Sequence, residues 1–330
     1  MGWFQYLGGA FLGWSLGANN SGNVFGTAVA SGMVKYRLAI WLIAAFVALG
    51  AILQGEAGIK TLSEDLNKRQ AADGTSTLEK SNDSALKFAI ATSMAAAITV
   101  TALTFLKLPA SASQAIVGAI AGVGILRGDA NWDGFGKVLA CWVATPLGGI
   151  VFTLAFYWIF RKILRKWRPS VFEYDPVVRL GLIICGCYGA YALGANNVAN
   201  VAAVFVGKGM LTAKQAAVFG AVCIAVGAVT YSKPVMTTVG KGIVKLDSFS
   251  AFVCVLSQGV SMYIFALVGV PVSSSQAIVG AALGIGVIKG AQTVNFKTLF
   301  HVAAGWTATP LAAGLAAAGI YAAMKLRYVP

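Results

Sequence analysis

Residues 17–23 read Gly-Ala-Asn-Asn-Ser-Gly-Asn, and the pattern returns at residues 194–200 as Gly-Ala-Asn-Asn-Val-Ala-Asn. A longer motif at residues 109–119, Pro-Ala-Ser-Ala-Ser-Gln-Ala-Ile-Val-Gly-Ala, returns at residues 271–281 as Pro-Val-Ser-Ser-Ser-Gln-Ala-Ile-Val-Gly-Ala. Two shorter matches fall in the same order: Gly32-Met33 with Gly209-Met210, and residues 142–147 with residues 306–311. Ordered matches of this kind indicate that the chain consists of two duplicated halves.

The composition excludes a water-soluble domain. The 330 residues are 58% hydrophobic and only 11% charged, whereas about a quarter of a typical soluble chain is charged. Several charge-poor stretches approach the ~20 apolar residues that a helix needs to cross a bilayer. Their continuous apolar character differs from the alternation of a membrane β-barrel. The sequence therefore predicts an all-α, polytopic membrane protein.

Each half contains five apolar segments. We place them near residues 3–30, 38–55, 86–107, 110–126 and 137–160, and then 178–206, 213–231, 249–270, 272–288 and 299–324. An odd number of segments per half gives the second half the opposite orientation in the membrane. The expected fold is thus two inverted repeats, residues 1–160 and 178–330, with broken helices or helical hairpins meeting at a central site.

The excess of basic residues is better explained by membrane topology than by a nucleic-acid partner. The linker at residues 161–177 is strongly basic, which places it in the cytoplasm by the positive-inside rule. Counting spans back from this linker puts both termini outside, in a membrane that we expect to be the prokaryotic inner membrane. The polar insert at residues 56–87 is then external. Its counterpart near Lys233 and Asp247 is then an internal loop.

The asparagine motifs lie near the middle of the first and sixth segments, so we expect those helices to break there. Polar groups in hydrocarbon must face a cavity or a ligand, or else cost several kcal/mol each. Their oxygens are candidate ligands for a substrate and for Na⁺, from the residues Asn20, Asn23, Asn197 and Asn200. The alternative is that these asparagines only join helices by hydrogen bonds.

The serine motifs predict an anion site. A proline that opens a helix leaves the following N–H groups free, and nearby serines add hydroxyl donors. Two such helix starts would surround a small oxyanion. The candidates are Ser111, Ser113, Gln114, Ser273, Ser274, Ser275 and Gln276. Ordinary N-caps without a ligand are the alternative. Thr145 and Thr309 could add hydroxyls, or could instead mark helix kinks beside Pro146 and Pro310.

The same residues argue against catalysis. His301 is the single histidine, so a histidine-pair metal site cannot form, and the spans contain no paired carboxylates. We therefore expect a transporter without a cofactor rather than an enzyme. Its partners would be a small oxyanion and the lipid bilayer, with no nucleic acid, and the pattern leaves a homodimer open.

These motifs resemble the inorganic phosphate transporter family, which includes bacterial sulfate permeases. The duplicated Gly-Ala-Asn-Asn-x-x-Asn is similar to the family's Gly-Ala-Asn-Asp-x-x-Asn, and the resemblance covers nearly the whole chain. It implies cation coupling and a central oxyanion site. This chain departs from the phosphate carriers because Asn20 and Asn197 replace aspartates. Register places Val47 and Ala225 where those carriers have glutamates.

Neutral residues at these positions favour sulfate over phosphate. A carboxylate beside a divalent anion is tolerable only with an intervening cation or a proton from the ligand, and sulfate has no proton to donate at neutral pH. We therefore predict a sulfate carrier coupled to Na⁺. Phosphate symport with Na⁺ or H⁺ and a passive anion channel are the alternatives. Glu56 is either a solvated interfacial charge or a proton site.

Overall fold

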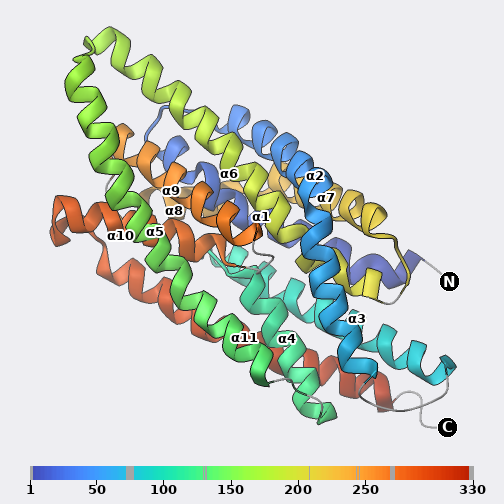
Figure 1. Cartoon of the computed structure of the whole chain (residues 1–330). Helices are drawn as coiled ribbons and strands as arrows, with labels where there is room; N and C mark the ends of the chain where they lie inside the picture. Colours follow the sequence, from blue (N-terminus) through green and yellow to red (C-terminus); the bar gives the residue numbers. More distant parts are fainter. Residues whose placement is uncertain are drawn as a thin grey trace.

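The computed structural model describes residues 3–71, 78–128, 130, 132–207, 209–242, 244, 246–267 and 272–326. Within them the chain forms short 3-10 helices at Trp3–Tyr6 and Ala291–Thr293 and the α-helices α1 (Leu7–Ala30), α2 (Tyr36–Ala71), α3 (Leu78–Phe105), α4 (Ala112–Arg127), α5 (Trp132–Trp167), α6 (Val171–Gly207), α7 (Ala213–Tyr231), α8 (Lys233–Gly242), α9 (Ser248–Leu267), α10 (Ser274–Lys289) and α11 (Phe296–Leu326). Figure 1 shows them as one elongated helical bundle.

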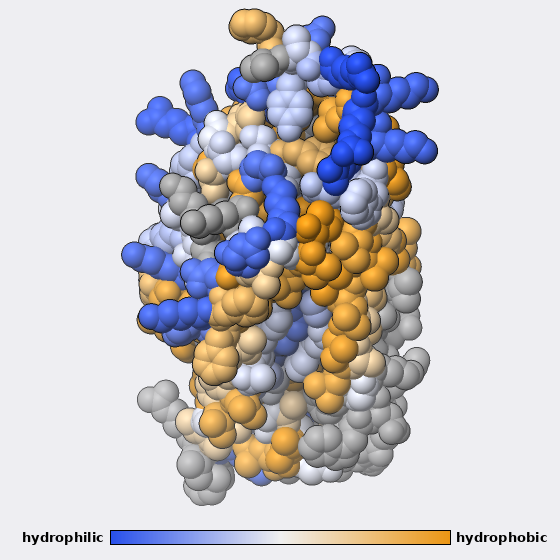
Figure 2. Space-filling model, turned by 90° about the vertical axis from the view of Figure 1, so that its left-hand side faces the viewer, coloured by the Kyte–Doolittle hydropathy of each residue, from blue (hydrophilic) through white to orange (hydrophobic). Residues whose placement is uncertain are grey.

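The helices have the length and composition of membrane spans. Seven of those in the described residues are long and apolar enough to cross a bilayer. Figure 2 shows hydrophilic side chains crowded at one end of the visible face, while hydrophobic side chains dominate the rest. A helix pairs its own backbone N–H and C=O groups, which find no hydrogen-bond partners in lipid. The predicted all-α polytopic membrane fold is confirmed.

Two connections contain more helix than the sequence indicates. Most of the basic linker at residues 161–177 is helical, because α5 continues to Trp167 and α6 begins at Val171. Within α5 the guanidinium of Arg161 lies over the ring of Trp158, 5.2 Å from its centroid. Near Lys233 the expected loop instead contains α8. Its Val235 and Met236 are buried and contact the rest of the core.

Helical hairpins are present in both halves, as predicted. The helices α3 and α4 pack together, and so do α9 and α10. With 16 residues each, α4 and α10 are about 24 Å long. This is shorter than the ~30 Å hydrocarbon core. A helix of that length whose outer end reaches the surface begins inside the membrane.

Glycines let helices of opposite halves touch at their backbones, in contacts that occur as matched pairs. A Cβ at Gly17 of α1 would overlap the backbone carbonyl of Ile224 in α7, and one at Gly194 of α6 would overlap that of Val47 in α2. The same exchange occurs between α4 and α11 and between α10 and α5. Figure 1 shows α4 and α11 running side by side. The duplicated glycines thus set the contacts between the halves.

We expect Gly17→Ala to destabilise the protein. The new Cβ meets backbone rather than a flexible side chain, so α1 and α7 must separate at a cost of about 1–3 kcal/mol. Thermal unfolding of the purified protein measures this loss. The matched control is Gly319→Ala in α11, where a Cβ would meet open space. Equal unfolding temperatures for the two variants would contradict the close contact.

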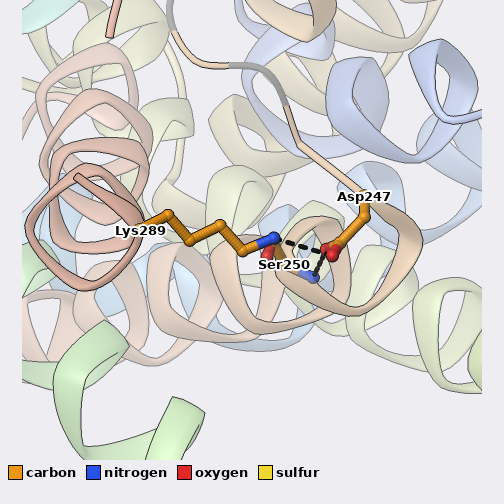
Figure 3. A network of polar contacts seen from close by, with 3 residues as sticks. All are labelled: Asp247, Ser250 and Lys289. Atoms are coloured by element: carbon orange, nitrogen blue, oxygen red, sulfur yellow. Dashed lines mark hydrogen bonds and ion pairs between the residues drawn. The ribbon is translucent and has the colours of Figure 1, made fainter. Parts of the chain in front are cut away.

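An ion pair fastens the α9–α10 hairpin at the end away from its tip (Figure 3). Asp247 accepts a hydrogen bond from the N–H of Ser250 at 2.8 Å, and its other oxygen lies 2.7 Å from Nζ of Lys289. Partial burial alone would raise the pKa of Asp247. The hydrogen bonds from Lys289 and Ser250, with the charge of Lys289, hold that pKa below its ordinary value.

Replacing Lys289 should therefore have a small, pH-dependent effect. A lowered carboxyl pKa contributes stability that is complete above the ordinary pKa of Asp247 and is lost as pH falls through the lowered value. We expect Lys289→Met to lower the unfolding free energy at pH 7 by up to about 1 kcal/mol. The difference should shrink in acid. Thermal unfolding at several pH values tests this, with Lys297→Met, also on the surface, as control.

Candidate functional site

Both serine motifs start helices inside the bundle. Ser111 precedes α4, and its Oγ accepts a hydrogen bond from the N–H of Gln114 at 3.3 Å. Ser273 does the same for Gln276 at the start of α10. The N-cap role considered from the sequence is therefore real. It leaves the N–H groups of the first two residues of each helix without intrahelical acceptors, so both helix starts can bind an anion.

A second serine adds a hydroxyl to each helix start. The Oγ atoms of Ser273 and Ser275 lie 2.9 Å apart, and those of Ser111 and Ser113 lie 3.5 Å apart. All these side chains are at most 2% exposed. Each half therefore presents two buried hydroxyls beside backbone N–H groups that have no intrahelical acceptor.

The expected break in α1 and α6 is wrong, because both helices run unbroken through their asparagine motifs. Asn19 shows why. Its Nδ2 donates to Leu108 O at 3.0 Å, and its Oδ1 accepts from the N–H of Ala110 at 2.7 Å. The equivalent Asn196 donates to Val272 O at 3.3 Å. The asparagine side chains satisfy the backbone at the hairpin tips, so the helices have no need to unwind.

Of the four candidate asparagines, Asn23 contacts one of these helix starts. Asn23 of α1 donates to Oγ of Ser274 in α10 at 3.0 Å, which joins motifs from opposite halves. Its equivalent, Asn200, instead donates to Oδ1 of Asn197 at 3.3 Å. This difference has a simple cause, because Ala112 occupies the position that Ser274 has in the second half and offers no hydroxyl.

Five amide oxygens of the candidate residues have no hydrogen-bond partner among the described residues. They belong to side chains that are at most 3% exposed: Asn20, Asn23, Gln114, Asn200 and Gln276. A buried oxygen without a donor costs about 1–3 kcal/mol. Five of them in two matched pairs of motifs indicate a place for a cation or for donor groups of a ligand. The site thus combines donors at the helix starts with unused neutral oxygens.

Thr145 and Thr309 do not contribute free hydroxyls. The Oγ1 of Thr145 donates to Cys141 O in its own helix at 2.7 Å, and Thr309 bonds to Gly305 O in the same way. Prolines follow both threonines inside α5 and α11. The structure therefore gives these threonines no free hydroxyl hydrogen to donate to a ligand, and the helix kinks that the sequence offers as the alternative stay a prediction.

Acidic and metal-binding groups lie elsewhere. Glu56 forms an ion pair with Lys60 one turn along α2 at 2.8 Å, and its side chain is 40% exposed. This agrees with a solvated interfacial charge. His301 is exposed on α11. Among the described residues, three or more His, Cys, Asp or Glu side chains nowhere gather into a possible metal site.

Backbone contacts also correct the register in the second half. Gly194 faces Val47, and the equivalent Gly17 faces Ile224. The partner of Val47 in the duplication is therefore Ile224 and not Ala225. Both positions are apolar, so the predicted loss of acidic groups from the two halves remains.

The sequence comparison missed two polar residues of α9. Gln258 and Ser261 are fully buried, and within the described part of the chain both amide atoms of Gln258 and the Oγ of Ser261 have no hydrogen-bond partner. Aligning the two halves by their serine motifs pairs Gln258 with Ala96 of the first half. Gln258 therefore lies outside every duplicated motif. A glutamine within an apolar span was the available signal.

The fold and the buried polar site define a multi-pass membrane transporter. A family model described as the phosphate transporter family matches residues 16–179 and 193–328, so the chain belongs to that family of transporters and not to an enzyme family. A solved structure titled "The sodium-dependent phosphate transporter" shares the fold. Its TM-score is 0.82 with 21% sequence identity, over 98% of each chain.

The relatives carry two kinds of name. "Putative phosphate permease MJ0630" of Methanocaldococcus jannaschii is 29% identical over 92% of this chain and 91% of its own length. "Sulfate permease CysP" of Bacillus subtilis is 27% identical over 87% of this chain and 77% of its own length. Phosphate names predominate among the relatives, so these similarities support an inorganic oxyanion without separating sulfate from phosphate.

Proposed function

We propose that the protein is a secondary active transporter of a small tetrahedral oxyanion, coupled to Na⁺, with sulfate as its preferred substrate. The anion binds between the starts of α4 and α10. Its oxygens accept from backbone N–H groups and from the hydroxyls of Ser113 and Ser275. A passive channel is a weaker interpretation, because the site is buried on all sides.

One observation carries the proposal: unused amide oxygens accompany the donors of both helix starts. Neutral oxygens are suitable ligands for a small hard cation such as Na⁺. Because α1 and α6 are unbroken, their backbone carbonyls are engaged in the helices, and the amides of Asn20, Asn23, Asn197 and Asn200 supply the oxygens instead. Donors for the anion and oxygens for the cation thus lie side by side.

Coupling to a cation is also an energetic requirement. Importing a free divalent anion against an interior-negative potential of about 100 mV costs about 4.6 kcal/mol. Two Na⁺ ions would cancel the charge of one sulfate. A proton would need a titrating group near the anion, and Glu56 is paired with Lys60 on the surface. Na⁺ is therefore the coupling ion that this site favours.

The preference for sulfate rests on the absence of carboxylates among the described residues of the site. The amide oxygens of Asn20 and Asn197 accept a hydrogen bond from a protonated ligand less strongly than an aspartate carboxylate would. Phosphate is the second candidate, which the names of most relatives favour. Its protonated oxygen could donate to an unused amide oxygen, such as that of Gln114 or Gln276.

We further propose that the halves are inverted repeats with both termini outside. In support, the equivalent helices α1 and α6 run antiparallel where they contact each other. A Cβ at Gly9 near the start of α1 would meet Phe205 near the end of α6, whereas one at Gly186 earlier in α6 would meet Phe25 near the end of α1. Cysteine labelling of each loop from one side of the membrane tests this orientation.

Uptake into proteoliposomes tests the function. With an inward Na⁺ gradient, we expect saturable uptake of labelled sulfate that excess phosphate inhibits weakly, and counterflow of preloaded sulfate. A pH gradient without Na⁺ should give little uptake. Glu56→Gln should behave like the wild type. Uptake that follows the pH gradient alone and disappears in Glu56→Gln would refute Na⁺ coupling, and phosphate uptake that excess sulfate leaves unchanged would refute the sulfate preference.

A further inference from the structure

The buried polar pair on α9 requires an explanation beyond the duplicated site. The carboxamide of Gln258 is fully buried, and neither its oxygen nor its nitrogen has a hydrogen-bond partner among the described residues. Ser261 is also fully buried with an unpaired Oγ. Three residues apart on one helix, the two side chains are neighbours. Proteins rarely leave such groups unsatisfied, so their usual partner is a bound species.

A glycine of α6 packs closely against the amide of Gln258. A Cβ at Gly189 of α6 would lie 3.1 Å from Oε1 of Gln258 and 3.3 Å from a methyl group of Val24 in α1. Gln258 therefore faces the junction of α6 and α1. Val24 directly follows Asn23, whose side chain bonds to Ser274. Gln258 thus lies close to the residue that follows Asn23, while Ser261 lies toward α5, where a Cβ at Gly148 would be 3.9 Å from its Oγ.

The first half does not repeat this pair. The register set by the serine motifs places Ala96 and Thr99 at the positions of Gln258 and Ser261. Thr99 satisfies its own hydroxyl by donating to Ala95 O at 2.8 Å. The unpaired groups therefore belong to the second half alone, and the duplication does not account for them.

We propose that Gln258 and Ser261 form a separate Na⁺ site, in addition to the oxygens of the asparagine motifs. The amide oxygen and the hydroxyl oxygen are two neutral, hard ligands, and water or backbone oxygens complete the coordination. Neutral ligands suit a monovalent ion better than a divalent one. The proposal rests on the Na⁺ coupling proposed above and adds one Na⁺ for each transport cycle.

Equilibrium binding of labelled Na⁺ to the purified full chain, without any oxyanion, tests this site. We expect Gln258→Met and Ser261→Ala each to bind one Na⁺ fewer per chain than the wild type. In Na⁺-free buffer, Gln258→Met should unfold at the same or a higher temperature, because it removes unpaired polar atoms from the interior. Gly189→Ala keeps both ligands but crowds Oε1, so its Na⁺ affinity should fall several-fold.

The control is Ser257→Ala on the same helix. Ser257 is equally buried, but its Oγ already donates to Val253 O at 2.7 Å, so its Na⁺ count should stay at the wild-type value. An unchanged count in both Gln258→Met and Ser261→Ala would overturn the site, as would a wild-type count with lower stability in Gln258→Met, the result expected for a structural water. If the wild type binds Na⁺ but carries no oxyanion, the proposed function fails while this site stands.

Discussion

Replacing both Asn20 and Asn197 by aspartate is expected to reduce sulfate uptake more than 100-fold. At ~5 Å and an effective dielectric of ~20, a carboxylate repels a divalent anion by several kcal/mol. A 100-fold loss requires only about 2.8 kcal/mol. The side chains are at most 2% exposed, so water screens the added charges poorly. Initial rates of sulfate uptake under a fixed Na⁺ gradient measure the effect.

The same variant should raise the uptake of phosphate relative to that of sulfate, because a carboxylate can accept a hydrogen bond from the proton that phosphate retains. The uncharged control is the double variant Asn20→Ala with Asn197→Ala. It removes the amides without adding charge and should lower the uptake of sulfate and of phosphate alike. If the double aspartate variant carries sulfate at nearly the wild-type rate, the anion does not bind beside these residues. Equal losses of both substrates would contradict the proposed basis of selectivity.

The duplication made most of the fold predictable. Apolar stretches located ten of the described α-helices, and the matched motifs paired six of them between the halves, because a repeated pattern shows which polar residues are placed deliberately in apolar spans. The predicted break in α1 failed for a reason that lies outside the motif. Asn19 finds its partners at Thr104, Leu108 and Ala110, about 90 residues away in sequence. Local sequence cannot show such distant partners, so the buried asparagines were interpreted as a sign of unwound backbone.

The site was predictable to the extent that it is duplicated. The serine motifs do start helices, and Asn23 does reach the serine motif of the other half. Departures from symmetry were less visible. Ala112 in place of Ser274 redirects Asn200 toward Asn197, and Gln258 has no equivalent in the first half. A comparison of the halves detects shared residues, whereas these differences acquire meaning only when the packing is known.

Replacing Ser113 and Ser275 together by alanine is expected to weaken sulfate binding at least 100-fold. A hydrogen bond to a charged acceptor contributes about 1.5–3 kcal/mol, so two lost bonds amount to about 3 kcal/mol or more. Both side chains are buried, which prevents water from replacing the hydroxyls freely. Calorimetric titration of the purified protein with sulfate in saturating Na⁺ measures the affinity. Ser21→Ala is the control, since that buried hydroxyl already donates to Gly17 O at 2.6 Å.

The two single variants should differ in a way that the sequence does not reveal. The Oγ atoms of Ser273 and Ser275 are 2.9 Å apart, whereas those of Ser111 and Ser113 are separated by 3.5 Å. Ser275→Ala therefore also removes a partner of the N-cap of α10, and we expect it to lose more affinity than Ser113→Ala. Wild-type affinity in the double variant would move the anion away from these helix starts. Equal single effects would show that the contact with Ser273 does not orient the hydroxyl for binding.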